Sequence, residues 1–327
     1  MLSLTCAISE YDHVRDLVSG RVRADGIDLS CLSMPVEEIF FRMLRHGEFD
    51  IAEMSMGRYA SLVSRNEAPF VAIPAFPSRM FRHSSIYVNA DRSVRDTSDL
   101  KGKRIGVPEW AQTAGIYTRG LLAQQSGLGL GDVEWVQAGI HETGRQEEVA
   151  VNPPAGVTVV RYSDRTLNDM LLSGEIDAMI SAHAPPSFEA GDRRIRRLFG
   201  DFMDIERRYW LDTKVFPIMH TIVVRRDVFE RNRWIAMNLL KAFEEAKHRS
   251  LERISEATAA RVPLPWAFEH LRRVKAEFGE DFWPYGLEPN RITLTAFLGF
   301  AFEQGVTARR LTPEDLFPPE THASFRV

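Results

Sequence analysis

The sequence lacks the features that would place the protein in a membrane or on nucleic acid. Among its 327 residues, no apolar run approaches the roughly 20 residues that a membrane-spanning helix needs. Its 41 lysines and arginines do not outnumber its 45 aspartates and glutamates, whereas phosphate binding normally requires a basic surplus. We therefore expect neither a membrane nor nucleic acid as a partner. Hydrophobic residues make up 44% and charged residues 26%, which excludes a disordered or fibrous chain.

Cysteine is scarce, and the N-terminus shows no export signal. The apolar stretch that ends at Ser9 is short and is followed directly by charged residues. A secretory signal would need a basic start, a longer apolar stretch and a small-residue cleavage site. We therefore expect a cytoplasmic protein, in which Cys6 and Cys31 are reduced thiols packed in apolar strands.

Sequence motifs for bound cofactors and for a nucleophilic serine are also missing. The chain contains no His-Glu-x-x-His, Cys-x-x-Cys, Walker-type or Gly-x-Ser-x-Gly pattern. Gly127, Gly129 and Gly131 follow a predicted helix rather than a strand, so we expect them to end that helix. The sequence thus predicts no dedicated metal site and no nucleotide.

Short apolar runs alternate with segments of helical periodicity, which is typical of an α/β fold. One set of predicted strands covers residues 2–9, 28–33, 50–54 and 70–76, and a second set covers residues 104–107, 133–136, 157–160 and 176–181. The apolar segments 84–89 and 218–225 are predicted as two passages between lobes. Helices are predicted at residues 36–45, 56–65, 113–125, 166–172, 234–252, 266–278 and 292–304. We therefore expect a discontinuous first lobe, residues 1–89 and 215–327, and a second lobe, residues 90–214.

In such folds ligands bind in the crevice beyond the carboxyl ends of the strands. Polar and aromatic side chains follow the predicted strand ends and passages, and we take them as site candidates: Ser9, Glu53, Ser55, Arg79, Arg82, His83, Trp110, Thr113, His183 and His220.

The two arginines suggest the charge of the ligand. Arginine pairs bidentately with carboxylates, so Arg79 and Arg82 favour a small or aromatic acid, although salt bridges between the lobes remain the alternative. Thr113 would begin a helix whose free N–H groups can hold an anion, or it would only cap that helix.

The candidates for proton chemistry are three histidines and one carboxylate. Taken singly, a histidine such as His83, His183 or His220 is more often a structural residue, but their convergence makes proton transfer by one or more of them an equal alternative. Glu53 lies at the end of an apolar strand, where a carboxylate is costly unless it is paired or functional. A buried salt bridge is the alternative for Glu53.

Segments spread over nearly the whole chain resemble one protein family, the 4,5-dihydroxyphthalate decarboxylases. They include Glu48-Phe-Asp-Ile-Ala-Glu-Met-Ser55, Phe70-Val-Ala-Ile-Pro-Ala-Phe-Pro-Ser-Arg79, Gly174-Glu-Ile-Asp-Ala178, Phe216-Pro-Ile-Met-His220 and Phe282-Trp-Pro-Tyr-Gly286. The resemblance implies the type II two-lobe fold of periplasmic solute receptors in a cytoplasmic enzyme of aromatic-acid catabolism. It also implies decarboxylation of a dihydroxylated aromatic acid, typically 4,5-dihydroxyphthalate to protocatechuate, without an organic cofactor.

Two segments depart from the family pattern. Ala182-His183 stands where many relatives carry Pro-Arg, and Glu109-Trp110-Ala111-Gln112 replaces the more usual Glu-Tyr-Gln-Met. Both are expected to line the second lobe's side of the cleft, so the exact substrate stays open.

Loss of carbon dioxide from a benzoate becomes easier when the ipso carbon is protonated first. That route needs an acid near the ipso carbon, a base near the para hydroxyl and cations on the remaining carboxylate. We hypothesise that His220 is the acid, with His83 as its rival, and that Glu53 is the base or hydroxyl acceptor. The remaining candidates would bind substrate: Arg79 and Arg82 by charge, and Ser9, Ser55, Trp110, Thr113 and His183 by shaping the pocket.

Other interpretations of the same sequence remain. The chain could be a non-catalytic binding protein for a small acid, or a diverged relative that catalyses another reaction on a related acid. A metal ion bound together with a catechol substrate, and association of the chain into a homo-oligomer through its aromatic C-terminal helices, also stay open.

Overall fold

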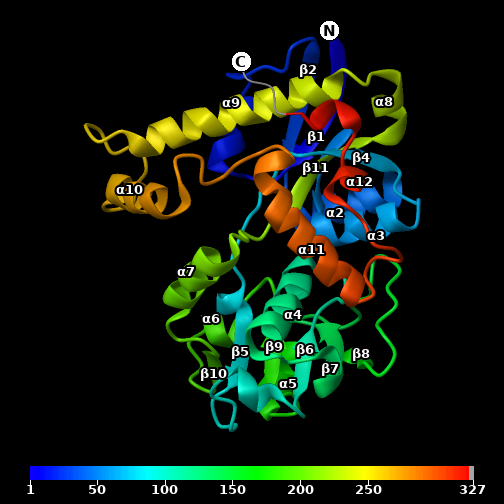
Figure 1. Cartoon of the computed structure of the whole chain (residues 1–327), viewed down its shortest axis with the longest axis vertical. Coiled ribbons are helices and arrows are strands. Elements are labelled where there is room, and N and C mark those ends of the chain that lie inside the picture. The colour runs from blue at the N-terminus through cyan, green and yellow to red at the C-terminus, as the bar shows by residue number, and fades with distance from the viewer. Residues whose placement is uncertain (324–327) are drawn as a thin grey trace.

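The computed structural model describes residues 1–323 and is built on two separate β-sheets, each flanked by helices (Figure 1). The five-stranded sheet has the order β2-β1-β3-β11-β4, and the six-stranded sheet has the order β10-β5-β9-β6-β7-β8. The predicted two-lobed α/β class is thereby confirmed. Within the described residues, no helix is long and apolar enough to span a membrane.

The first sheet combines strands from distant parts of the chain. It contains β1 (Leu2–Ile8), β2 (Ile27–Ser33), β3 (Ile51–Ser55), β4 (Phe70–Ile73) and β11 (His220–Arg225). The central strand β3 is buried along its whole length, as expected for a strand covered on both faces. Because β11 runs antiparallel to β3, its first residue, His220, lies at the edge of the sheet where β1 and β3 end.

The second sheet is mostly parallel. It contains β5 (Ile86–Asn89), β6 (Arg104–Val107), β7 (Glu134–Gly139), β8 (Thr158–Thr166), β9 (Ala178–Ile180) and β10 (Ile195–Arg197). Strands β6 to β9 are mutually parallel, so the segments that follow β6, β7 and β9 emerge at one edge of the sheet.

The passages between the sheets lie elsewhere than the sequence predicts. Segment 84–89 is largely strand β5, which pairs with β9 and β10 in the second sheet, and segment 218–225 is largely β11 of the first sheet. The predicted end of the first lobe's N-terminal part at residue 89 is therefore wrong, because the chain has entered the second sheet by residue 86. The connecting segments, 74–85 and 198–219, touch each other through a bridge between Arg79 and Ile218.

The helices surround the sheets and fill the C-terminal third of the chain. Their bounds are α1 (Arg15–Val18), α2 (Val36–His46), α3 (Met56–Ser64), α4 (Thr113–Ser126), α5 (Leu167–Ser173), α6 (Pro186–Glu189), α7 (Phe202–Thr213), α8 (Arg226–Arg231), α9 (Ile235–Ser255), α10 (Ala267–Phe278), α11 (Arg291–Glu303) and α12 (Pro313–Leu316). Helix α4 ends as predicted at Gly127, whose φ of 67° is the left-handed conformation that glycine adopts without strain. Helix α7 and strand β10 have no counterpart among the predicted elements.

Helix α11 connects the two lobes. It lies between the first sheet's lobe and the second sheet's helix α4 (Figure 1). The ring of Tyr117 on α4 packs against Phe297 and Phe300 of α11, with ring centroids 5.2 and 6.3 Å apart. The lobes are thus joined by two chain passages and by a packed helix.

Candidate active site

A cavity of about 320 Å³ lies where the edges of the two sheets face each other. The first sheet's edge contributes Ser9, Ser55 and His220, and the second sheet's edge contributes Thr113 and His183. The cavity therefore occupies the crevice beyond the strand ends. Apolar side chains complete its wall: Val36, Phe40, Met80, Ala114, Ala182 and Met219.

His220 and Glu53 form a closely bonded polar pair at the site. The Nδ1 atom of His220 lies 2.6 Å from Oε1 of Glu53, which is fully buried. The sheet register brings them together: Glu53 pairs with Ile222, and His220 lies two residues before Ile222 on the same face. Since the carboxylate accepts the Nδ1 hydrogen, Nε2 is the ring nitrogen left for a ligand in the cavity.

Glu53 is held from two further directions. Its Oε2 atom accepts a hydrogen bond from the backbone N–H of Ser9 at 3.1 Å. Its Oε1 atom also accepts one from the hydroxyl of Tyr11 at 2.7 Å. Burial and the Glu53 carboxylate raise the pKa of Tyr11, so its hydroxyl stays protonated. Glu53 thus lies behind His220 with three donors, and not among the residues that line the cavity.

Arg82 lines the cavity with a cation that forms no direct salt bridge within the described residues. Its Nε atom donates to the Met219 sulfur at 3.2 Å, and within residues 1–323 its two terminal nitrogens have no hydrogen-bonding partner. Burial lowers the pKa of Arg82 to about 10, which leaves the side chain charged at neutral pH. The Glu206 carboxylate stabilises this cation only from beyond salt-bridge distance, so the position suits an anionic ligand in direct contact with the guanidinium.

Arg79 does not reach the cavity, contrary to the prediction. Its guanidinium donates to the backbone oxygens of Phe216 and Pro284, at 3.3 and 2.6 Å, and to the side-chain oxygen of Asn290. These contacts tie the first passage between the sheets to the second passage and to the segment before α11. Arg79 is therefore a structural residue.

Two other candidates are also turned away from the cavity. His83 is fully buried and its Nε2 lies 2.9 Å from Oε1 of Gln125, while burial lowers its pKa. Trp110 is fully buried and donates its indole hydrogen to the backbone oxygen of Gln304 at 2.7 Å. Neither residue lines the cavity, so the structure leaves His220 as the acid candidate and removes Trp110 from the pocket wall.

Thr113 and Ser55 meet across the cleft. Their hydroxyl oxygens lie 3.0 Å apart, and Thr113 Oγ1 also accepts the backbone hydrogen of Gly57 at 2.9 Å. Gly57 tolerates this approach because it has no side chain: a Cβ atom there would lie 2.2 Å from the backbone oxygen of Ala111. Both residues line the cavity, and their contact joins the two lobes there.

His183 closes one side of the cavity by pairing with Glu37 on α2. Its Nε2 atom lies 2.7 Å from Glu37 Oε1, so the pair spans the two lobes. The contact lowers the pKa of Glu37 to about 2 and raises that of His183. Both residues also line a neighbouring cavity of about 480 Å³, formed largely by residues 139–145, so the pair stands at the border between the two spaces.

The cavity wall also contains a cluster of three charged residues, Arg58, Glu109 and Arg145, whose pairing the sequence did not predict. Arg58 on α3 donates to both carboxylate oxygens of Glu109, at 3.0 and 2.8 Å, and Arg145 donates to Oε1 of Glu109 at 2.6 Å. Glu109 lies two residues after β6, in the segment that was expected to line the second lobe's side of the cleft. Arg58 lies within a helix and Arg145 in a loop, so no strand end in the sequence marked either of them as a site residue.

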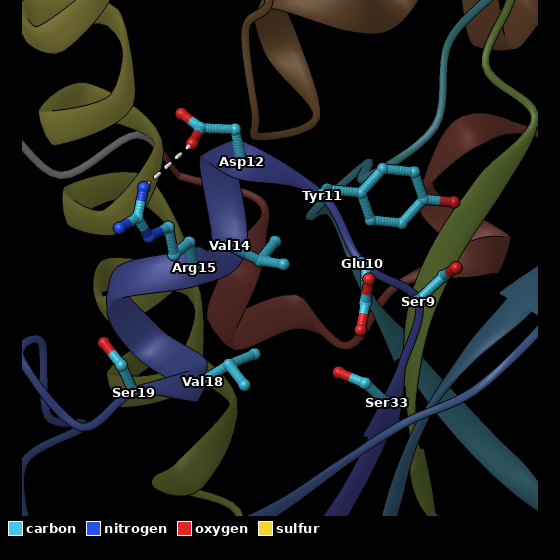
Figure 2. A pocket seen from close by; sticks show the side chains of 9 residues that line it. All are labelled: Ser9, Glu10, Tyr11, Asp12, Val14, Arg15, Val18, Ser19 and Ser33. Atoms are coloured by element: carbon cyan, nitrogen blue, oxygen red, sulfur yellow. Dashed lines mark ion pairs between the residues drawn. The ribbon is translucent and has the colours of Figure 1, made fainter. Parts of the chain in front are cut away.

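A further pocket of about 400 Å³ opens on the other side of the segment after β1 (Figure 2). Ser9 and Tyr11 border both this pocket and the cavity between the lobes. Figure 2 shows the Tyr11 ring pointing away from the ion pair between Asp12 and Arg15, whose charged atoms are 3.7 Å apart. Among residues 1–323, no cluster of three or more histidine, cysteine or acidic side chains is arranged to hold a metal ion.

Comparison with known proteins places this fold and cleft in a class. A family model described as the periplasmic substrate-binding protein of phosphonate ABC transporters matches residues 10–177, more than half of the chain. The sulfonate-binding protein SsuA of Methylobacillus flagellatus superposes with a TM-score of 0.58 at 14% identity, covering 98% of this chain and 92% of that one. SsuA of Escherichia coli superposes with a TM-score of 0.55 at 13% identity, covering 98% of this chain and 99% of that one. The chain thus belongs to the class of proteins built on the periplasmic solute-binding fold.

Two curated relatives narrow this class. A 4,5-dihydroxyphthalate decarboxylase of Comamonas testosteroni is 39% identical over 327 residues, which cover all of this chain and 99% of the relative. One of Pseudomonas putida is 43% identical over 201 residues, covering 61% of this chain and 78% of the relative. The chain is therefore a member of the 4,5-dihydroxyphthalate decarboxylase family, as the sequence motifs indicated.

Proposed function

We propose that this protein is a carbon–carbon lyase that converts 4,5-dihydroxyphthalate to protocatechuate and carbon dioxide. The family relationship over the full chain names the reaction, and the observation that carries the chemistry is the pair of His220 and Glu53 at the cavity wall. A ring acid held by a buried carboxylate, facing a cavity with an unpaired arginine, matches what the reaction requires.

The proton is delivered to the carbon that loses its carboxylate. His220, protonated on both ring nitrogens, gives its Nε2 hydrogen to that carbon while Nδ1 keeps its bond to Glu53. The carbon–carbon bond then breaks, its electron pair restores the aromatic ring, and carbon dioxide leaves. One proton is consumed in each turnover, so the His220 ring must be reprotonated from solvent before the next.

Glu53 has a different role from the one that the sequence suggested. Its two oxygens are occupied by His220, Tyr11 and the backbone of Ser9, so it orients the acid instead of accepting a substrate hydroxyl. Such a carboxylate fixes the tautomer of a histidine and stabilises its charged form, as in the catalytic triads of hydrolases.

Arg82 is the residue that we assign to the carboxylate that the product retains. The two carboxylates of the substrate are on neighbouring ring carbons, so holding one at Arg82 places the other within a short distance. The apolar side chains Phe40, Met80 and Met219 surround this space and favour departure of uncharged carbon dioxide.

The test is release of carbon dioxide from purified protein given 4,5-dihydroxyphthalate, phthalate, hydroxybenzoates and no substrate. We expect release from the dihydroxy acid and none from phthalate, because phthalate lacks the para hydroxyl that supplies electrons to the protonated carbon. His220→Gln should lower kcat by about 10²–10⁴. His248→Gln, an exposed histidine on α9, is the matched control and should keep full activity.

Other outcomes would decide against the proposal. Tight binding of the dihydroxy acid without release would make the chain a small-acid binding protein. Full activity of His220→Gln would remove His220 as the acid. Repeating the assay after treatment with a chelator determines whether a metal ion takes part, which the proposal does not require.

A further inference from the structure

We propose that Tyr11 is a positioning residue of this site, whose hydroxyl fixes the Glu53 carboxylate and thereby sets how readily His220 releases its proton. The inference deepens the proposed function and rests on it, because it assigns a task to a residue that does not touch the reacting atoms. Tyr11 belongs to the segment after β1, far in sequence from both Glu53 and His220.

Two donors share one oxygen atom of Glu53. Tyr11 donates its hydroxyl hydrogen to Oε1 at 2.7 Å, and His220 Nδ1 lies 2.6 Å from the same atom. The other oxygen, Oε2, is engaged by the backbone of Ser9 at 3.1 Å. Each hydrogen bond draws on the negative charge of the carboxylate, so the bond from Tyr11 weakens the hold of Oε1 on the His220 ring.

The tyrosine also separates this carboxylate from the surface. Its ring borders both the cavity between the lobes and the open pocket of Figure 2, with the hydroxyl turned away from the ion pair of Asp12 and Arg15. The His13 ring packs against it at a centroid distance of 5.2 Å. Burial of Glu53 behind this ring strengthens every contact that the carboxylate makes.

The sign of the effect follows from the shared oxygen. Without the Tyr11 hydroxyl, more negative charge stays on Oε1, and the charged His220 ring is held more strongly. His220 then becomes a weaker acid, and it titrates at a higher pH. The charged and titratable groups that face His220 across the cavity stay the same in all variants: Glu37, Arg58, Arg82, Glu109, Arg145 and His183.

The experiment compares two replacements of Tyr11 that act in opposite directions. Tyr11→Phe removes the donor, whereas replacing Tyr11 by 3-fluorotyrosine keeps the ring in place and makes the hydroxyl a stronger donor. The ring of His220 is titrated by NMR in the substrate-free protein, with its signals identified by their loss in His220→Gln. We expect the midpoint to move up by about half a pH unit in Tyr11→Phe and down in the fluorotyrosine protein.

The activity profile supplies a second readout. The fall of kcat on the alkaline side should shift in the same direction as the NMR midpoint, with kcat of Tyr11→Phe lowered about three- to tenfold and KM little changed. His13→Gln, which alters the packing of the Tyr11 ring but keeps its hydroxyl, is the control and should leave the His220 midpoint in place.

Unchanged midpoints in both Tyr11 variants would overturn the inference, as would an effect confined to KM, which would make Tyr11 a substrate contact. Absence of carbon dioxide release from the wild-type protein would instead refute the proposed function. The NMR titration needs no turnover, so it decides the link between Tyr11 and His220 in either case. The fluorotyrosine protein keeps the test valid if Tyr11→Phe fails to fold.

Discussion

Arg79 and Arg82 are close in sequence and similarly buried, with 5% and 6% of their surface exposed, but they have different tasks. The hydrogen bonds of Arg79 lead to backbone and amide oxygens of the protein, whereas the terminal nitrogens of Arg82 are left for a ligand. Sequence spacing could not separate them, because residues 74–82, which contain both arginines, form neither helix nor strand. In a helix or strand, periodicity would have indicated which side each residue faces.

Substitution of these arginines should therefore give opposite results. Arg82→Met should raise KM for the dihydroxy acid about 10- to 100-fold with little loss of stability, because a charge-assisted contact to the substrate is removed. Arg79→Met should keep KM but lower the free energy of unfolding by about 2–4 kcal/mol, since buried oxygens lose their donors. Urea denaturation and steady-state kinetics on both variants check this. A stable Arg79→Met protein with a raised KM would contradict it.

The pair of Glu37 and His183 should make substrate binding depend on pH. The pair raises the pKa of His183, so its stabilising effect is present below the usual histidine pKa of about 6.5 and is lost as the pH rises through the raised value. Above that pH, Glu37 is an uncompensated anion beside a cavity that binds a dianion. KM should then rise about two- to fivefold, an effect limited by solvent screening at these half-exposed side chains.

Kinetics of Glu37→Gln provide the matched comparison. Without the carboxylate, KM should stay flat over the same pH range, while the pH dependence of kcat follows His220 as before. A KM that rises equally in both proteins would show that another group, and not this pair, controls binding.

At the scale of elements, the strands were the most predictable part of the fold. All eight predicted strands begin or end within two residues of an observed one, because buried parallel strands appear as continuous apolar runs. Strand β10 was missed because it is a short edge strand with two arginines among its three residues. The meeting of Glu53 and His220 was also outside what sequence could show, since it depends on the register of β3 and β11.

The contact between α4 and α11 provides a test at this scale. A Cβ atom at Gly120 on α4 would lie 2.4 Å from the Phe300 ring, whereas at Gly299 on α11 it would meet nothing within 4 Å. Gly120→Ala should lower the free energy of unfolding by about 1–3 kcal/mol through overpacking. Gly299→Ala should raise it by about 0.5–1 kcal/mol, because alanine favours a helix. Equal changes in the free energy of unfolding for the two substitutions, measured by urea denaturation, would contradict the close packing of Gly120 against Phe300.

At the scale of the whole molecule, the two lobes are joined by side-chain contacts in addition to the two chain passages between them. Arg79 ties both passages to the segment before α11. Gln304, just after α11, accepts from Arg119 through its side chain and from the Trp110 indole through its backbone, at 2.7 Å in both cases. Ser61 on α3 donates to the backbone oxygen of Ala150, in the segment between β7 and β8 of the second sheet, at 2.9 Å. Opening the cleft would break all of these contacts together.

We therefore expect this protein to bind its substrate without the hinge closure that periplasmic binding proteins undergo. Small-angle scattering with and without phthalate, a ligand that should bind without reacting, would show an unchanged radius of gyration. A contraction of about 1 Å or more would contradict this expectation and indicate a receptor-like hinge. Gln304→Ala is the informative variant, because it removes the side-chain contact with Arg119 between the lobes. If the cleft can open, the radius of gyration of this variant should increase in the ligand-free protein.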